Sequence, residues 1–288
     1  MVIKLAKYIF PFFIIFGNHN LFSSEINSPT KNIDFNINHA EVISGFPIEG
    51  NLVIAKTKPE NKVLFNNQKI QIDDSGIFIF GFHRDEESSS KLVIINSEND
   101  QFETIIQPIK REYKIQRING LKQSMVSPPK ELIKKIKSDI KKVKIARSSS
   151  AVIGDFTKGF DWPVKGTITG VYGSQRILND VPKSPHFGID ISVPNGTKVI
   201  APASGTVTLT EDLYYSGLTV ILNHGLNLNS TFLHLSEINV KLGDRVNRGG
   251  LIGLSGNTGR STGPHLDWRM DWNGKRLDPE MLAGPMKQ

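Results

Sequence analysis

The chain has 288 residues, a formal net charge of +7 with a pI near 9.4, and no cysteine. This length favours two domains. The lack of cysteine excludes disulfides, thiolate zinc sites and cysteine catalysis, so any metal must be held by nitrogen and oxygen. The basic charge favours an anionic partner. Nucleic acid is not expected, because the lysines and arginines fall in no nucleic-acid-binding motif.

The first 24 residues are typical of a secretory signal peptide. Lys4 and Lys7 supply a basic start, and residues 8–16 form an apolar core. That core is shorter than the roughly 20 residues that a membrane-spanning helix needs. Cleavage is expected near Ser23 or Ser24, with an uncleaved anchor as the alternative. The protein is therefore expected to be exported to the periplasm or cell envelope.

Residues 25–108 read as short strands separated by turns rich in glycine, asparagine and aspartate. Regular short strands with alternating apolar residues predict a small β-sandwich of immunoglobulin-like type. No catalytic constellation occurs in it, so we expect it to space, dock or cover the second domain. The strands are expected within 42–54, 62–72, 76–82, 91–95 and 102–106.

Residues 109–150 form a basic linker. Thirteen lysines and arginines stand against three acids between Ile109 and Arg147. Ser127 as cap, Pro128 in the first turn and Glu131 at the positive end predict the start of a helix. Apolar residues then recur at helical spacing; they are Leu132, Ile133, Ile136, Ile140 and Val143. This amphipathic helix either connects the domains with a solvated basic face or binds an anionic envelope surface.

Residues 151–288 are dense in glycine and turns and leave hardly any room for a helix. We expect an antiparallel, hairpin-built, all-β domain. Its strands are expected near 162–164, 166–172, 188–193, 198–201, 205–210, 218–223, 230–233, 251–254 and 265–271.

Five groups suited to metal binding or proton transfer lie in this region. His265 and Asp267 are two residues apart in a strand-like run, so they share one face about 7 Å apart. Upstream are the motifs His186-x-x-x-Asp190 and His234-Leu-Ser236. The remaining histidines are expected to have ordinary structural roles; they are His19, His39, His83 and His224.

These motifs, with Gly188 inside the first of them and Gly263-Pro264 before His265, resemble the lysostaphin-type (LytM-like) zinc metallopeptidases, a family of peptidoglycan endopeptidases. The resemblance covers about residues 159–282. It implies a Zn²⁺ cofactor, peptidoglycan as partner and substrate, and hydrolysis of peptide cross-links by metal-activated water. A bond from D-alanine to a diamino acid is the expected target.

By the same resemblance, His186 and Asp190 are metal ligands, and His234 and His265 are catalytic. The family's third ligand is a histidine, whereas this chain has Asp267 there. A carboxylate can bind zinc, but a second negative charge reduces the Lewis acidity of the ion and its selectivity. On a straight strand, residues four apart lie about 13 Å from each other, so the chain is expected to bend at Gly188.

Two questions stay open at this point. Arg176, in the loop before His186, is a candidate for binding a substrate carboxylate, with a structural role as the alternative. The substituted third ligand also leaves a second function open, that of a catalytically inactive homologue that binds the cell wall and activates amidases. A wall-binding module without turnover is a weaker third hypothesis.

Overall fold

The computed structural model describes residues 35–120, 128–149, 151 and 153–287. The expected signal peptide at 1–24 and the expected cap residue Ser127 lie outside the described residues. Within the described part, no helix combines the length and apolarity that a membrane span requires.

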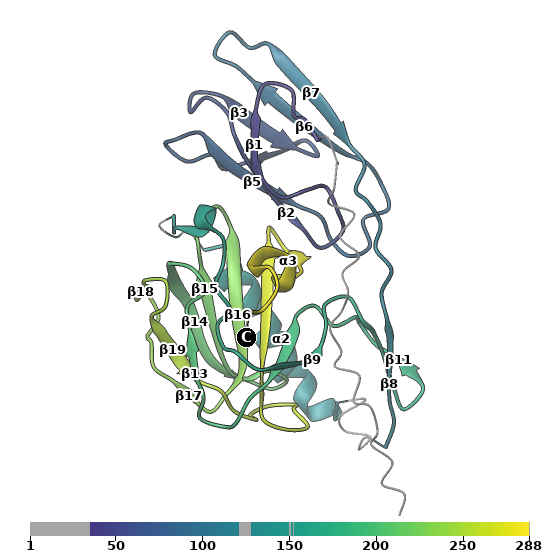
Figure 1. The fold of residues 1–288 in the computed structure, drawn as a ribbon. Helices are drawn as coiled ribbons and strands as arrows, with labels where there is room; N and C mark the ends of the chain where they lie inside the picture. The colour runs from purple at the N-terminus through teal and green to yellow at the C-terminus, as the bar shows by residue number, and fades with distance from the viewer. Residues whose placement is uncertain (1–34, 121–127, 150, 152, 288) are drawn as a thin grey trace, which may run out of the picture. The chain divides into compact units, whose positions relative to one another are not determined.

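Two antiparallel sheets occupy the region expected to be a sandwich. Their core contains Val53, Phe78, Phe80 and Leu92, each fully buried. The all-β fold class is confirmed, while the domain boundaries at residues 108 and 150 stay a prediction. One sheet has the order β1 (Glu41–Ser44), β2 (Leu52–Lys56), β5 (Ile77–Gly81); the other has β4 (Gln68–Ile70), β3 (Lys62–Phe65), β6 (Ser90–Ile95), β7 (Gln101–Ile106) (Figure 1).

The linker forms strand β8 (Ile115–Ile118), the 3₁₀ turn η1 (Lys130–Leu132) and helix α2 (Ile133–Arg147). α2 lies against β14 (Gly205–Leu213) and β15 (Gly217–Asn223). Its contacts differ from the apolar pattern, because Ile140 is 63% exposed whereas Asp139 is buried. Asp139 accepts a hydrogen bond from the Tyr214 amide at 2.9 Å. Ala146 and Val143 pack against Leu209, Leu213 and Ile221.

The largest sheet is antiparallel throughout and carries the predicted motifs. Its neighbouring strands β16 (Leu228–Leu235), β20 (His265–Trp272) and β12 (Ile189–Ser192) carry or adjoin these motifs. Its order is β18 (Arg245–Val246), β14 (Gly205–Leu213), β15 (Gly217–Asn223), β16 (Leu228–Leu235), β20 (His265–Trp272), β12 (Ile189–Ser192), β9 (Thr167–Gly170), with β21 (Lys275–Leu277) also paired to β20.

Two small sheets and one short helix complete this region. The strand expected at 162–164 is wrong, since these residues form no strand. Strand β10 (Gln175–Leu178) pairs in parallel with β8 of the linker. The sequence analysis expected only antiparallel hairpins here and did not predict this pairing. The first small sheet is β13 (Lys198–Ile200), β19 (Leu251–Leu254), β17 (Glu237–Ile238); the second is β11 (Val181–Pro182), β10 (Gln175–Leu178), β8; the helix is α3 (Pro279–Ala283).

Strand β20 positions the site because its two faces differ. Leu266, Trp268 and Met270 are fully buried in the core. Since side chains alternate across a strand, the intervening residues face the other side of the sheet. They are polar: His265, Asp267, Arg269 and Asp271.

His224, which follows β15, is fully buried. Its Nδ1 lies 2.9 Å from the Ser204 carbonyl oxygen and its Nε2 lies 2.9 Å from Ser230 Oγ. Burial lowers the pKa of His224 to about 4 from its ordinary value of 6.5. His224 is therefore a neutral part of the core.

Because His224 is buried in its neutral form, we expect the free energy of unfolding to decrease in acid. Below pH 6.5 the unfolded chain binds a proton that folded His224 does not bind until about pH 4. The stabilisation is therefore complete above pH 6.5 and decreases as the pH falls toward 4. Between pH 7.5 and 5, the free energy of unfolding should fall by about 2 kcal/mol more in the wild type than in His224→Gln. Urea titrations at both pH values measure this, and equal losses would contradict it.

Candidate metal and catalytic site

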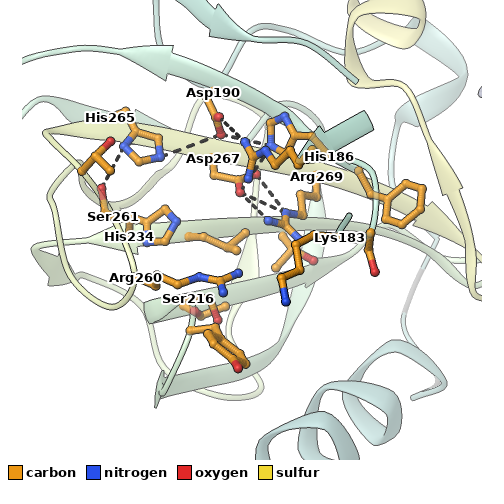
Figure 2. Close-up of a pocket in the computed structure, with 18 of the residues that line it drawn as sticks. Lys183, His186, Asp190, Ser216, His234, Arg260, Ser261, His265, Asp267 and Arg269 are labelled. Carbon is orange, nitrogen blue, oxygen red and sulfur yellow. Dashed lines mark hydrogen bonds and ion pairs between the residues drawn. The ribbon is translucent and has the colours of Figure 1, made fainter. Parts of the chain in front are cut away.

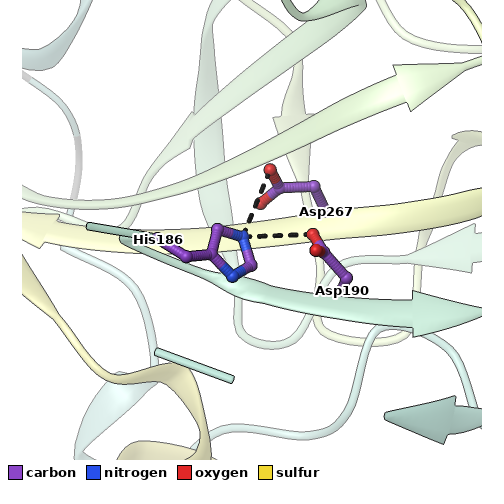
Figure 3. Close-up of side chains that lie close together, drawn as sticks. All are labelled: His186, Asp190 and Asp267. Carbon is purple, nitrogen blue, oxygen red and sulfur yellow. Dashed lines mark ion pairs between the residues drawn. The ribbon is translucent and has the colours of Figure 1, made fainter. Parts of the chain in front are cut away.

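Three candidate metal ligands meet where β12 pairs with β20. The register places Asp190 opposite Asp267. His186 precedes β12, and its Nε2 lies 3.1 Å from Asp190 Oδ1 and 3.6 Å from Asp267 Oδ2 (Figure 3). One donor atom from each residue lies within 4.8 Å of the other two. The expected bend is present at Gly188, so the chain brings His186 back to Asp190.

The environment of these three residues suits a divalent cation. Carboxylates directly across a strand pair repel each other, and Asp267 is only 2% exposed. Within the described residues, neither ring nitrogen of His186 makes a hydrogen bond of acceptable geometry, although both are buried. A cation between the imidazole and the two carboxylates would satisfy all three. One nitrogen and two oxygens can hold zinc, and also harder divalent ions.

Each carboxylate also has its own arginine. Arg176 Nη2 donates to Asp190 Oδ2 at 2.8 Å, while Arg269 donates to Asp267 from Nε at 2.9 Å and from Nη2 at 2.5 Å. Burial acts to raise the pKa of Asp267, but Arg269 and His186 hold that pKa well below its ordinary value. Asp267 is therefore ionised at neutral pH, as metal binding requires.

Two glycines make room for the carboxylates. A Cβ added at Gly170 would lie 2.3 Å from Asp190 Oδ2, and one added at Gly188 would lie 2.6 Å from Asp267 Oδ1. Both distances are far below van der Waals contact. Any side chain at either position would therefore displace a candidate ligand.

His234 and His265 lie beside this triad, with ring centroids 4.8 Å apart (Figure 2). His234 Nδ1 lies 2.7 Å from the Thr258 carbonyl oxygen, and His265 Nδ1 lies 2.8 Å from that of Gly263. A carbonyl can only accept, so each Nδ1 carries a proton and each neutral ring has Nε2 as its proton acceptor. His265 Nε2 lies 3.8 Å from Asp190 Oδ1.

His234 has an unusual backbone for a residue with a side chain. It lies at an irregularity in the pairing of β16 with β15, between the paired residues Phe232 and Leu235, with φ near +62° in the left-handed region. Such conformations cost energy and concentrate at functional sites. Burial lowers the pKa of His234, which keeps its ring neutral at physiological pH.

All six residues singled out in the sequence line one cavity of about 850 Å³. They are Arg176, His186, Asp190, His234, His265 and Asp267. The polar face of the large sheet contributes Ser192, Thr219 and Thr231 to its lining. The linker also contributes, because Gln116 of β8 and Val143 and Arg147 of α2 line the same cavity.

The sequence analysis missed the partners of the site residues. Arg269 could have been found, because it lies two residues after Asp267 and so shares its face. Gly170 could not, since only folding brings β9 to the triad. The proposed substrate role of Arg176 stays a prediction, and the structure adds its ion pair with Asp190.

Known proteins are similar to this part of the chain. Residues 184–279 match the family model for peptidase family M23. The chain is 42% identical over 113 residues to the peptidoglycan DD-endopeptidase ShyA of Vibrio cholerae, a match of 38% of this chain and 26% of that protein. It is 29% identical over 213 residues to an uncharacterised metalloprotease of Buchnera aphidicola, covering 65% of this chain and 56% of the relative. The matches thus span under two thirds of these relatives.

A solved structure supports the fold. A candidate M23 peptidase from Pseudomonas aeruginosa superposes with a TM-score of 0.65 and 27% identity, covering 85% of this chain and 98% of that one. The family match at residues 184–279 includes His186, Asp190, His234, His265 and Asp267. The chain therefore contains a domain of peptidase family M23.

Proposed function

We propose that this protein is a zinc-dependent endopeptidase that hydrolyses peptide cross-links of peptidoglycan at the cell envelope. The observation that carries the proposal is the His186–Asp190–Asp267 triad, whose donor atoms lie within 4.8 Å of one another beside two oriented histidines. The similarity to a peptidoglycan DD-endopeptidase supports the substrate class.

In this mechanism His186, Asp190 and Asp267 would hold the cation. A divalent ion there would supply Lewis acidity, which polarises a peptide carbonyl and makes water more acidic. Arg176 and Arg269 keep the two carboxylates ionised through their ion pairs. All three candidate ligands line the cavity.

His234 and His265 move protons in this proposal. Because both Nδ1 atoms donate to backbone carbonyls, the Nε2 lone pairs are the basic sites. A neutral ring can take a proton from water at Nε2, and the resulting imidazolium can donate it to the departing amine or hydrogen-bond the carbonyl oxygen. Both rings have the same tautomer, so one can accept the proton from water while the other hydrogen-bonds the carbonyl oxygen.

The pairing of Arg269 with Asp267 favours one alternative, a catalytically inactive homologue that binds the wall and activates amidases. Arg269 contacts both carboxylate oxygens of Asp267, so it competes with a cation for them. On this hypothesis the arginine replaces the metal, and the cavity binds the wall without turnover.

Metal removal separates the two functions. Purified peptidoglycan incubated with the zinc-loaded protein should release cross-link-derived peptides, and a chelator should stop the release until zinc is restored. Mass spectrometry of the soluble fragments gives the bond cleaved. Intact peptidoglycan with zinc present, together with chelator-insensitive stimulation of an amidase, would support the regulator instead.

A further inference from the structure

The cavity beside the triad has a strong excess of positive charge. Two carboxylates, Asp190 and Asp267, line it. The cations that line it are Arg147, Arg176, Lys183, Arg260, Arg269 and Arg276. A bound divalent cation would add to this excess. The charge therefore suits an anionic group on whatever enters the cavity.

Four of these cations contact aspartates. Arg176 and Arg269 contact the candidate ligands, as described above. Arg147 Nε lies 2.8 Å and Arg276 Nη1 3.7 Å from Oδ1 of the buried Asp271. These four arginines thus have a role within the protein, whereas Lys183 has no ion pair with the part of the chain that the structure describes.

Lys183 and Arg260 come from two loops that are both held in place. The Lys183 amide donates to the Arg176 carbonyl at 2.9 Å, which ties it to β10. The Arg260 amide donates to the Tyr215 carbonyl at 2.8 Å, and its guanidinium carbon lies 4.3 Å from the centre of the Tyr215 ring. The charged ends of both side chains point into the cavity, below His186 and Arg269 in Figure 2.

Although Arg260 is exposed, partial burial of its guanidinium lowers its pKa, and the positive charges of Arg176 and Arg269 lower it further. An anion bound near Arg260 would offset this cost. A carboxylate is a suitable anion, because a guanidinium can bind its two oxygens at once and an ammonium adds a third donor.

We propose that Lys183 and Arg260 form a subsite for a carboxylate of the peptide substrate, beside the His186–Asp190–Asp267 triad. This inference rests on the proposed function, since it takes the occupant of the cavity to be a peptide. A cross-link through the side-chain amine of a diamino diacid carries a carboxylate on the carbon next to the cleaved nitrogen. The subsite therefore selects peptides with a free carboxylate close to the cleaved bond.

The test compares two cross-linked muropeptides that differ only in this carboxylate, which is free in one and amidated in the other. Binding is measured by calorimetry on the zinc-loaded full chain carrying His265→Gln, so that hydrolysis of either peptide is slow. The free acid should bind about tenfold more tightly or better, because charge-assisted hydrogen bonds are lost on amidation. In Lys183→Met/Arg260→Met the preference should fall to within about twofold.

A matched control removes two cations outside the cavity. Lys198 and Lys241 are exposed and do not line it, so Lys198→Met/Lys241→Met should keep the full preference for the acid. Equal binding of both peptides by the parent chain, or an undiminished preference in Lys183→Met/Arg260→Met, would overturn the subsite. If both peptides were hydrolysed at equal rates, the peptidase function would be supported and the proposed subsite would be rejected. If the wild type bound the free acid selectively but hydrolysed neither peptide, the subsite would stand and the peptidase function would be rejected.

Discussion

Replacing Asp267 with alanine should abolish stoichiometric zinc binding and, with it, hydrolysis of peptidoglycan. His186 and Asp190 would be left as two ligands, one fewer than catalytic zinc sites use. We expect the dissociation constant for zinc to rise by at least about 100-fold, given that loss of even an outer contact costs about 10–100-fold. Metal content by mass spectrometry and competition with a chelating dye measure this directly.

Two further variants separate ligation from folding. Asp267→Ala leaves the partly buried Arg269 without its carboxylate, which is itself destabilising, so Asp267→Ala/Arg269→Met removes both charges. Circular dichroism should report a native fold for the double variant, still without zinc. Asp267→His restores a nitrogen donor, the residue that the family resemblance implies, and should bind zinc again. Full zinc occupancy in a folded Asp267→Ala/Arg269→Met protein would remove Asp267 from the ligand set.

Replacing His265 or His234 with glutamine should reduce kcat by about 10²–10⁴-fold while leaving zinc occupancy unchanged. The Nδ1 atoms of both rings are bound to backbone carbonyls, so the loss would come from the Nε2 atoms that face the cavity. Glutamine can still donate to the carbonyl but cannot accept a proton from water. Rates on a purified cross-linked muropeptide, with zinc measured in the same samples, test this.

Ser261→Ala provides a control for the loop that carries His265. Ser261 Oγ lies 3.2 Å from His265 Nδ1, which the Gly263 carbonyl also contacts. Its removal should change kcat by less than about tenfold, because one of two partners remains. A loss of zinc in His265→Gln would instead make His265 a ligand, and the proton-transfer role would then fall to His234 alone.

Asp267 stands where the family resemblance implies a histidine, but the structure shows how its negative charge is balanced. A second carboxylate opposite Asp190 doubles the negative charge at the site, but Arg269 adds a positive charge at hydrogen-bonding distance from Asp267. Arg176 does the same for Asp190. The two acids and two arginines cancel, so the net charge of the triad with its arginines is close to zero before a cation binds.

Several features followed from local patterns in the sequence. Alternation in β20 placed His265 and Asp267 on one face because a strand repeats every two residues. The glycine in His186-x-Gly188-x-Asp190 indicated a bend, and a bend is present there. Resemblance to the lysostaphin-type peptidases supplied the pairing of the motifs, which spacing could not provide. The all-β class followed from short alternating runs separated by turn residues.

The linker shows where local patterns were insufficient. Helical periodicity identified α2 correctly, but it suggested an apolar face that includes Ile140, whereas Asp139 and Ala146 are the buried residues. The partners on β14 and β15 decide which face is covered, and they lie more than 60 residues further along the chain. Pairing of β8 with β10 is likewise a long-range contact without a local signal.

By itself, the sequence determined the types of residue at the site, the strands that carry most of them and the need for oxygen and nitrogen ligands. Only the tertiary structure decided that Asp190 stands opposite Asp267, because register depends on pairing between strands that are distant in the chain. It also decided that Gly170 and Gly188 make room for the carboxylates, that Arg176 pairs with Asp190, and that Lys183 and Arg260 line the same cavity. Each of these depends on packing between segments that no local pattern brings together, whereas Arg269 and Asp267 share a face because they are two residues apart on one strand.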